Sequence, residues 1–191
     1  MADLVRSEFI LGGQRSGKSR RAELLARRWL ELSPQHRAVM MATGQAWDGE
    51  MRERIARHQA DRALRVPGMA TVEEPLALAD ALRKHSDTST LIVVDCLTLW
   101  LTNLMMPADT AQARDEAAVI AYGEALCKAI AAAPGPVVLV GNEIGLGVIP
   151  MGSDVRAFVD ALGRLNQQVA GSCQRVTLMA AGLPLTFKDV T

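Results

Sequence analysis

Residues 8–19 read EFILGGQRSGKS, an apolar run followed by the pattern G-x-x-x-x-G-K-S. The glycines of this pattern let the backbone curl, so that successive N–H groups point at a chain of phosphates. Lys18 is placed to reach the outer phosphates, and the Ser19 hydroxyl is placed to ligate Mg²⁺. The apolar run is typical of a buried strand, and the residues after Ser19 follow a helical pattern whose N-terminal end also favours phosphate. The sequence therefore predicts a P-loop that binds a nucleoside triphosphate or a closely similar ligand.

The 191-residue chain has the length and composition of one globular domain, which we expect to span 1–191. Hydrophobic residues make up 49% of the chain and charged residues 22%. The 21 basic and 21 acidic residues cancel, and only 4% of the residues are aromatic. Because a general nucleic-acid binder needs excess positive charge and stacking groups, we expect no nucleic-acid partner.

The apolar and cysteine patterns favour a cytoplasmic protein without a membrane span. The longest apolar run, 91–106, is interrupted by polar residues and is shorter than the about 20 apolar residues that a span needs. It fits a strand followed by a helix. Cys96, Cys127 and Cys173 are far apart and form no C-x-x-C or Cys/His motif, which favours a reducing compartment.

Short apolar runs alternate with helical patterns along the chain. Continuous apolar runs of this length are typical of strands that are buried on both faces of a parallel sheet. The alternation predicts an α/β, doubly wound fold whose mostly parallel central sheet is flanked by helices. We expect strands at 9–11, 38–42, 91–95, 137–141 and 175–180. We expect helices after the P-loop and at about 48–64, 75–85, 111–132 and 154–170.

Asp95 ends the apolar run 91–94 and so places a carboxylate at the mouth of a predicted buried strand. Ligands of doubly wound folds lie at the carboxyl ends of the strands. Beside a P-loop, an acid in this position holds Mg²⁺ directly or through water, and we favour that role for Asp95. The alternative is that Asp95 only caps the helix that begins near Thr98.

Asn142 and Glu143 follow the predicted strand 137–141 in the same way, and glycines at 145 and 147 come next. Such glycines would let the backbone approach a ligand closely. A contact with substrate or metal and an ordinary strand-to-loop turn are equally compatible with this position.

His58 has two interpretations from the residues alone. Met51, Ile55, His58 and Arg62 recur at helical spacing, so His58 shares a helix face with two apolar residues. This favours a histidine at the edge of the core. The alternative is a nucleophile, because a neutral imidazole can accept a phosphoryl or nucleotidyl group and pass it on.

Two segments are more specific than the P-loop: EMRERIARH at 50–58 and NEIGLGVIP at 142–150. They stand in one order with MAT at 41–43, TVEEP at 71–75 and AGLPL at 181–185. In this combination the chain resembles, over nearly its whole length, the bifunctional adenosylcobinamide kinase/adenosylcobinamide-phosphate guanylyltransferase family of cobalamin biosynthesis. The resemblance implies a RecA-like P-loop fold and a homo-oligomer, a trimer in the family.

The resemblance also implies two reactions on a corrinoid substrate. Adenosylcobinamide is phosphorylated with ATP or GTP, and GMP is then transferred from GTP to the new phosphate with release of pyrophosphate. The family's histidine in the 50–58 segment becomes guanylylated, which reverses the interpretation of His58. His58 and Lys18 are thus the expected catalytic residues, and Ser19 and Asp95 the expected Mg²⁺ ligands. The family's nucleotide contacts fall on Gly12, Gly13, Gln14, Arg15, Ser16, Gly17, Lys18, Ser19, Met41, Ala42, Thr43, Gln59, Ala60, Asp61, Arg62, Glu73 and Asp95.

Two departures from the family border the expected guanylyl site. Met69-Ala70 stands where many members have Trp-Arg, after a slightly longer approach at 65–69. Residues 59–62 read QADR, where relatives often have a more basic or glycine-containing stretch. Two alternatives therefore stay open, a kinase without GMP transfer and a RecA-like ATPase stimulated by nucleic acid. Intact Lys18 and Ser19 argue against a non-catalytic nucleotide-binding subunit.

Overall fold

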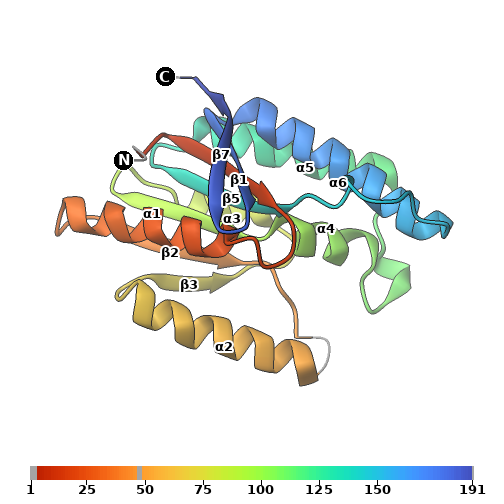
Figure 1. Ribbon diagram of the computed structural model, residues 1–191, viewed down its shortest axis with the longest axis horizontal. Coiled ribbons are helices and arrows are strands. Elements are labelled where there is room, and N and C mark those ends of the chain that lie inside the picture. Colours follow the sequence, from red (N-terminus) through yellow and green to blue (C-terminus); the bar gives the residue numbers. More distant parts are fainter. Residues whose placement is uncertain (1–3, 47–48, 191) are drawn as a thin grey trace.

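The computed structural model describes residues 4–46 and 49–190, which form one seven-stranded sheet with helices on both faces (Figure 1). The strands lie in the order β3-β2-β4-β5-β1-β6-β7. All neighbouring pairs are parallel except β6 and β7. The strands are β1 Ser7–Gly12, β2 Arg37–Ala42, β3 Ala70–Glu73, β4 Thr90–Asp95, β5 Val137–Asn142, β6 Arg175–Ala180 and β7 Leu183–Asp189. The α-helices are α1 Lys18–Leu32, α2 Gly49–Arg65, α3 Leu78–His85, α4 Leu97–Met105, α5 Glu116–Ala132 and α6 Ser153–Ser172, and Thr110–Gln112 is a 3-10 turn.

The central strands are buried on both faces because their side chains alternate between two apolar layers. In β1, Phe9 and Leu11 belong to the core that α3, α4, α5 and α6 cover, whereas Ile10 belongs to the core under α1. Val94 and Val93 of β4 divide in the same way. This explains why the strands read as continuous apolar runs, and the predicted α/β fold with a mostly parallel sheet is confirmed.

The five predicted strands are all present, and the structure adds β3 and β7 at the two edges of the sheet. Both edge strands are largely exposed, so they lack the continuous apolar run by which the others were recognised. The helix predicted at 111–132 begins only at Glu116, because the Asp115 side chain accepts the hydrogen bond of Ala118 N–H and caps the helix there. The helix predicted from residue 75 begins at Leu78, after Glu74 has accepted bonds from two backbone N–H groups. The first residue of the helix predicted at 48–64 lies outside the described residues.

Because the strands are parallel, the predicted site residues lie together at the carboxyl ends of the strands. Gly12 pairs with Asn142 of β5. On the other side, Ala42 pairs with both Asp95 of β4 and Glu73 of β3. The carboxyl ends of β1 to β5 therefore lie at the same end of the sheet, which is where doubly wound folds bind their ligands.

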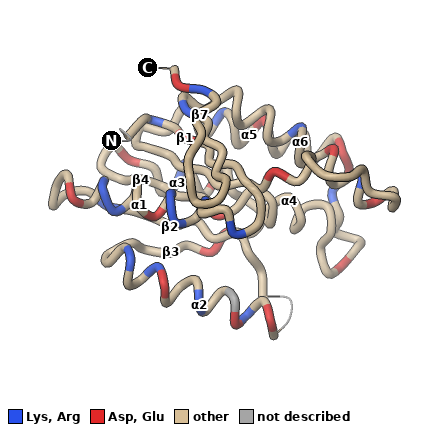
Figure 2. The backbone as a smooth tube through the Cα atoms, in the orientation of Figure 1, with Lys and Arg blue, Asp and Glu red and all other residues tan. Residues whose placement is uncertain are grey.

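Basic and acidic residues are scattered along the backbone without a face of one sign (Figure 2). In the described ranges, no helix combines the length and the apolar character that crossing a membrane requires.

Candidate nucleotide-binding site

The loop between β1 and α1 has the curled backbone that a P-loop requires. Gly12 cannot carry a side chain, because an added Cβ would stand 2.4 Å from Met179 O and 2.6 Å from Ser16 Oγ. Arg15 and Gly17 both have left-handed backbones, with φ of 55° and 100°. Gly17 is also the N-cap of α1, so the curl leads directly into a helix N-terminus. The loop presents the backbone that binds phosphate in this motif.

Lys18 lies over this loop rather than in solvent. Its Nζ donates a hydrogen bond of 2.7 Å to Gly13 O, and the residue is buried. Burial lowers the pKa of Lys18, and the nearby Cys96 and Asp95 oppose that shift. An anionic phosphate in the loop would offer the ammonium a stronger acceptor than a carbonyl oxygen.

Thr43, just after β2, holds the end of β4 in place. Its Oγ1 donates to Cys96 O at 2.7 Å and accepts from Cys96 N–H at 2.9 Å. Thr43 N–H donates to Asp95 O at 3.2 Å, and Asn103 of α4 donates to Thr43 O at 2.7 Å. The peptide bond between Asp95 and Cys96 is cis. These contacts fix the backbone of Asp95 at the site, a task for Thr43 and Asn103 that sequence reasoning missed.

Three further residues predicted to contact the nucleotide lie at the carboxyl ends of two neighbouring strands: Met41 and Ala42 in β2, and Glu73 in β3. Met41 is fully buried in the core, so it offers a nucleotide no accessible surface in this structure. Glu73 is exposed at the end of β3 and pairs with Ala42.

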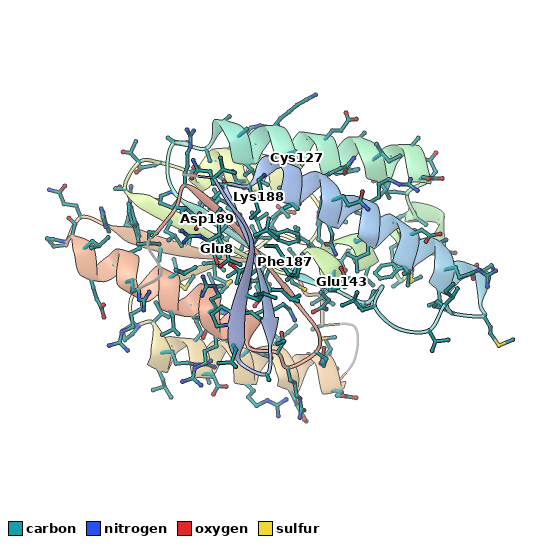
Figure 3. The ribbon with its side chains drawn as sticks, turned by 45° about the horizontal axis from the view of Figure 1, so that its top comes forward. Glu8, Cys127, Glu143, Phe187, Lys188 and Asp189 are labelled. Atoms are coloured by element: carbon teal, nitrogen blue, oxygen red, sulfur yellow. The ribbon has the colours of Figure 1, made fainter. Side chains whose placement is uncertain are left out.

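Asn142 and Glu143 are joined to the P-loop by backbone geometry. Glu143 N–H donates to Gly12 O at 3.1 Å. Its carboxylate accepts from Gly145 N–H at 2.7 Å. Figure 3 shows Glu143 and Glu8 toward opposite ends of the strands, with Glu143 on the P-loop side. The position that the sequence left open is thus directly beside the predicted phosphate site.

A second contact that the sequence did not reveal comes from the turn between β6 and β7. Gly182 N–H donates to Ser16 O of the P-loop at 3.1 Å. Ala181 and Gly182 both have positive φ, 52° and 79°, as in the tight turns that join antiparallel strands. The signal that could have predicted this hairpin is the glycine at 182, because it stands in the short connection between the two strands and glycine readily adopts a positive φ.

His58 lies apart from these residues on α2, which Figure 1 shows outside the sheet beside α1 and β3. Its side chain is exposed, as are those of Gln59, Ala60 and Asp61. Among the described residues, no hydrogen bond or ion pair joins His58 to the P-loop. The structure therefore brings the strand-end residues together and leaves the predicted nucleophile on a neighbouring helix.

The C-terminal end of α2 is held firmly. Arg62 is buried and donates to Thr71 Oγ1 of β3 at 3.1 Å. Arg65 forms an ion pair of 3.0 Å with Glu23 of α1. Burial raises the pKa of Glu23, and Arg65 and Arg62 oppose that shift. Arg62, predicted to contact the nucleotide, makes a structural contact here.

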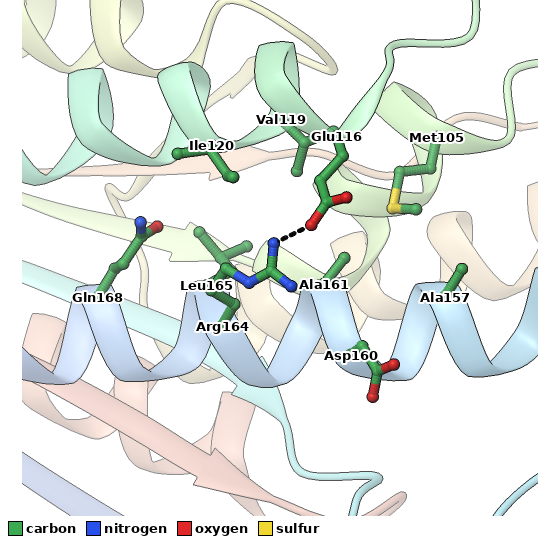
Figure 4. A pocket seen from close by; sticks show the side chains of 10 residues that line it. All are labelled: Met105, Glu116, Val119, Ile120, Ala157, Asp160, Ala161, Arg164, Leu165 and Gln168. Atoms are coloured by element: carbon green, nitrogen blue, oxygen red, sulfur yellow. Dashed lines mark hydrogen bonds and ion pairs between the residues drawn. The ribbon is translucent and has the colours of Figure 1, made fainter.

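Two cavities lie away from the P-loop. One, of about 370 Å³, lies between α5 and α6 beside Met105 of α4. The ion pair between Glu116 and Arg164 crosses it (Figure 4). The other, of about 250 Å³, lies beyond the C-terminal end of α4 and includes Asn103.

The few oxygen atoms available as metal ligands beside the P-loop suit Mg²⁺ better than a metal whose ligands all come from protein side chains. In the part of the chain that the structure describes, no three His, Cys, Asp or Glu side chains gather as a metal site. Mg²⁺ needs only one or two protein oxygens, because phosphates and water complete its shell. The Ser19 hydroxyl and the Asp95 carboxylate are donors of that kind.

The sequence is similar to that of known proteins over nearly its whole length. A sequence model described as cobinamide kinase/cobinamide phosphate guanyltransferase, CobU, matches residues 8–187. The bifunctional adenosylcobalamin biosynthesis protein CobP of Pseudomonas aeruginosa is 47% identical over 182 residues, 95% of this chain and 96% of that protein. The corresponding CobU protein of Escherichia coli K12 is 32% identical over 187 residues, 94% of this chain and 98% of that protein.

A solved structure supports the fold alone. The flagellar accessory protein FlaH of Methanocaldococcus jannaschii superposes with a TM-score of 0.53 at 12% identity, over 97% of this chain and 79% of that chain. The predicted RecA-like P-loop fold is confirmed by this likeness together with the sheet order. By its sequence over nearly its full length, the chain belongs to the CobU family of cobinamide kinases and cobinamide phosphate guanyltransferases.

Proposed function

We propose that this single-domain enzyme catalyses both reactions of its family at one nucleotide site. It phosphorylates the hydroxyl of adenosylcobinamide with ATP or GTP, and it then transfers GMP from GTP to that phosphate through a guanylylated His58. The observation that carries the proposal is the combination of a complete P-loop with an exposed histidine on the adjacent helix α2. A kinase needs only the first of these features.

The P-loop handles the phosphates in both reactions. Residues 12–19 would enclose the phosphate chain with backbone N–H groups, and α1 would add the positive end of its dipole. Lys18 would leave Gly13 O for the phosphate oxygens and stabilise the charge that develops on them. The rest of the nucleotide would contact the accessible residues among those predicted, which are Ala42, Glu73 and residues 59–61 of α2.

Ser19 and Asp95 would hold Mg²⁺ on the phosphates. When bound, the ion neutralises charge on the phosphate oxygens during transfer. Asp95 is suited to this role because Thr43 fixes its backbone at the end of β4.

His58 would carry GMP between donor and acceptor. An imidazole nitrogen forms a bond to the α-phosphorus of GTP as the bond from that phosphorus to the bridging oxygen breaks, and pyrophosphate leaves. An oxygen of adenosylcobinamide phosphate then attacks the same phosphorus, the imidazole leaves, and adenosylcobinamide-GDP forms. Because no hydrogen bond or ion pair joins His58 to the P-loop among the described residues, we expect α2 to approach the loop when GTP binds.

Labelling with α-³²P-GTP and Mg²⁺ tests the covalent step. Wild-type protein should acquire acid-labile label, because the phosphorus–nitrogen bond to imidazole is broken by acid, and His58→Ala should acquire none. His85→Ala, which changes a histidine at the end of α3, is the matched control and should label like wild type. Equal labelling of His58→Ala and wild type would refute the role of His58.

Product analysis separates this proposal from its rivals. An enzyme that stops at adenosylcobinamide phosphate is a kinase only, and hydrolysis stimulated by single-stranded DNA would indicate a RecA-like ATPase. The balance of 21 basic and 21 acidic residues and the 4% of aromatic residues argue against the second rival, which needs a positive groove and stacking groups.

We further propose that the enzyme is a cytoplasmic homo-oligomer, with the trimer as the form that the family resemblance suggests. The cytoplasm is supported by three cysteines that are all free thiols. Light scattering in solution measures the oligomeric state directly.

A further inference from the structure

We propose that residues 144–152, the loop between β5 and α6, form the docking surface for the corrinoid ring of the acceptor. This inference rests on the proposed function, because it names where that function's bulky substrate lies. The loop is called the β5–α6 loop below.

The β5–α6 loop is apolar and yet exposed. Its sequence, IGLGVIPMG, contains no polar side chain. Leu146 is 83% exposed, Val148 96%, Ile149 78% and Met151 96%. Because an exposed run of apolar residues is unfavourable in water, such a run marks a surface that binds something.

The loop begins beside the P-loop. The strand before it ends with Asn142, which pairs with Gly12, and Glu143 N–H bonds to Gly12 O at 3.1 Å. Figure 1 shows the loop running outward from the end of β5 to the start of α6. A molecule that reaches the phosphates from this side must cross these residues.

The loop is also held at both ends. At its start, the Glu143 carboxylate accepts from Gly145 N–H at 2.7 Å. At its end, the Arg156 guanidinium of α6 donates to Pro150 O at 3.0 Å and to Met151 O. The apolar side chains between these clamps are therefore displayed in a defined arrangement, which lowers the entropy that a ligand must remove.

The chemistry of the acceptor matches this surface. A corrinoid is a large macrocycle with a methylated rim and amide side chains, and its reacting hydroxyl sits on one of those arms. When the hydroxyl lies at the terminal phosphate, the ring must rest on the adjacent surface. Apolar side chains would pack against the ring, and backbone groups of the irregular loop would meet the amides.

A second copy of the chain is the other possible occupant of the loop, and it is an outcome of the test. We favour the corrinoid because the loop starts at the phosphate site itself, where the acceptor hydroxyl has to be delivered.

The test compares the double variant Leu146→Ser/Val148→Ser with Leu32→Ser, which changes an apolar residue that is 66% exposed at the far end of α1. We expect the KM for adenosylcobinamide to rise by about tenfold or more in the double variant, because apolar contact area with the ring is lost. The KM for ATP, measured at saturating adenosylcobinamide, should keep its wild-type value. So should the labelling by α-³²P-GTP, because that step involves no corrinoid. Leu32→Ser should match wild type in every measurement.

Three results separate failure of the inference from failure of the proposed function. An unchanged corrinoid KM in the double variant overturns the docking surface. A shift to smaller particles in light scattering, with the KM for ATP changed as well, assigns the loop to a subunit interface and also overturns it. If wild-type protein phosphorylates no corrinoid at all, the proposed function itself is wrong.

Discussion

Replacing Thr43 by valine tests whether this residue holds the end of β4, which carries the proposed Mg²⁺ ligand Asp95, or merely faces the nucleotide. Valine has the shape of threonine, so the change opens no cavity and removes only the hydroxyl. The buried Cys96 N–H then loses its acceptor, whereas Cys96 O keeps its bond of 3.1 Å from Trp100 N–H. An orphaned buried N–H costs about 1–3 kcal/mol, and the lost bond to the carbonyl costs about 0.5–1.5 kcal/mol. We therefore expect Thr43→Val to lower the free energy of unfolding by about 1.5–4.5 kcal/mol.

Urea unfolding followed by circular dichroism measures this difference, and Thr43→Ser is the control because it keeps the hydroxyl. Serine loses one buried methyl group, which costs about 1 kcal/mol. Kinase assays at 10 °C, where both variants stay folded, should show a lower kcat for Thr43→Val, since Cys96, the residue after Asp95, loses both hydrogen bonds to the hydroxyl. If the valine variant is as stable as the serine variant, the hydroxyl does not hold β4, and the reasoning fails.

Two further predictions concern the P-loop and the cysteines. Gly12→Ala should lower the free energy of unfolding by about 1–3 kcal/mol, because its Cβ would meet backbone of β6. Gly13→Ala, with open space around the added Cβ, should not, and thermal unfolding of the two proteins that shows equal loss would contradict this account. Burial raises the pKa of Cys96 to about 11 and that of Cys173 to about 12. At pH 8 iodoacetamide should therefore modify the half-buried Cys127 first, as mass spectrometry of the folded protein can show, and rapid modification of Cys96 would refute its burial.

The sequence predicted the strands that lie inside the sheet because each is buried on both faces. It did not predict β3 and β7, which are edge strands with mostly exposed residues. In β3 the four residues ATVE are too few and too polar for a pattern, and in β7 a proline interrupts the run. These segments are strands because β3 pairs with β2 and β7 pairs with β6. That pairing belongs to the tertiary structure and leaves no pattern in the segments themselves.

The conformation of the P-loop could also be predicted, because its sequence pattern is local. The spacing of Gly12, Gly17 and Lys18 within one short segment is enough to predict how the loop would bind phosphate. The supports of that site were not predictable, since Thr43 and Cys96 are 53 positions apart and Gly182 reaches Ser16 from the far end of the chain. Glu143 was noticed for its place after a strand, but only the pairing of β1 and β5 shows that it adjoins the P-loop.

The departures from the family near residues 65–70 gain a physical explanation from the way α2 is anchored. Val66 is buried in the core under α1, and Met69 packs against the same core. With the Arg65–Glu23 ion pair, these contacts anchor the C-terminal end of α2 to α1 and to the core beneath it. Sequence change there alters packing on α1, while His58, two turns earlier, stays on the exposed part of the helix. The departures therefore do not by themselves favour a kinase without GMP transfer, because the residues that differ at 65–69 serve the anchor and the proposed nucleophile lies outside it.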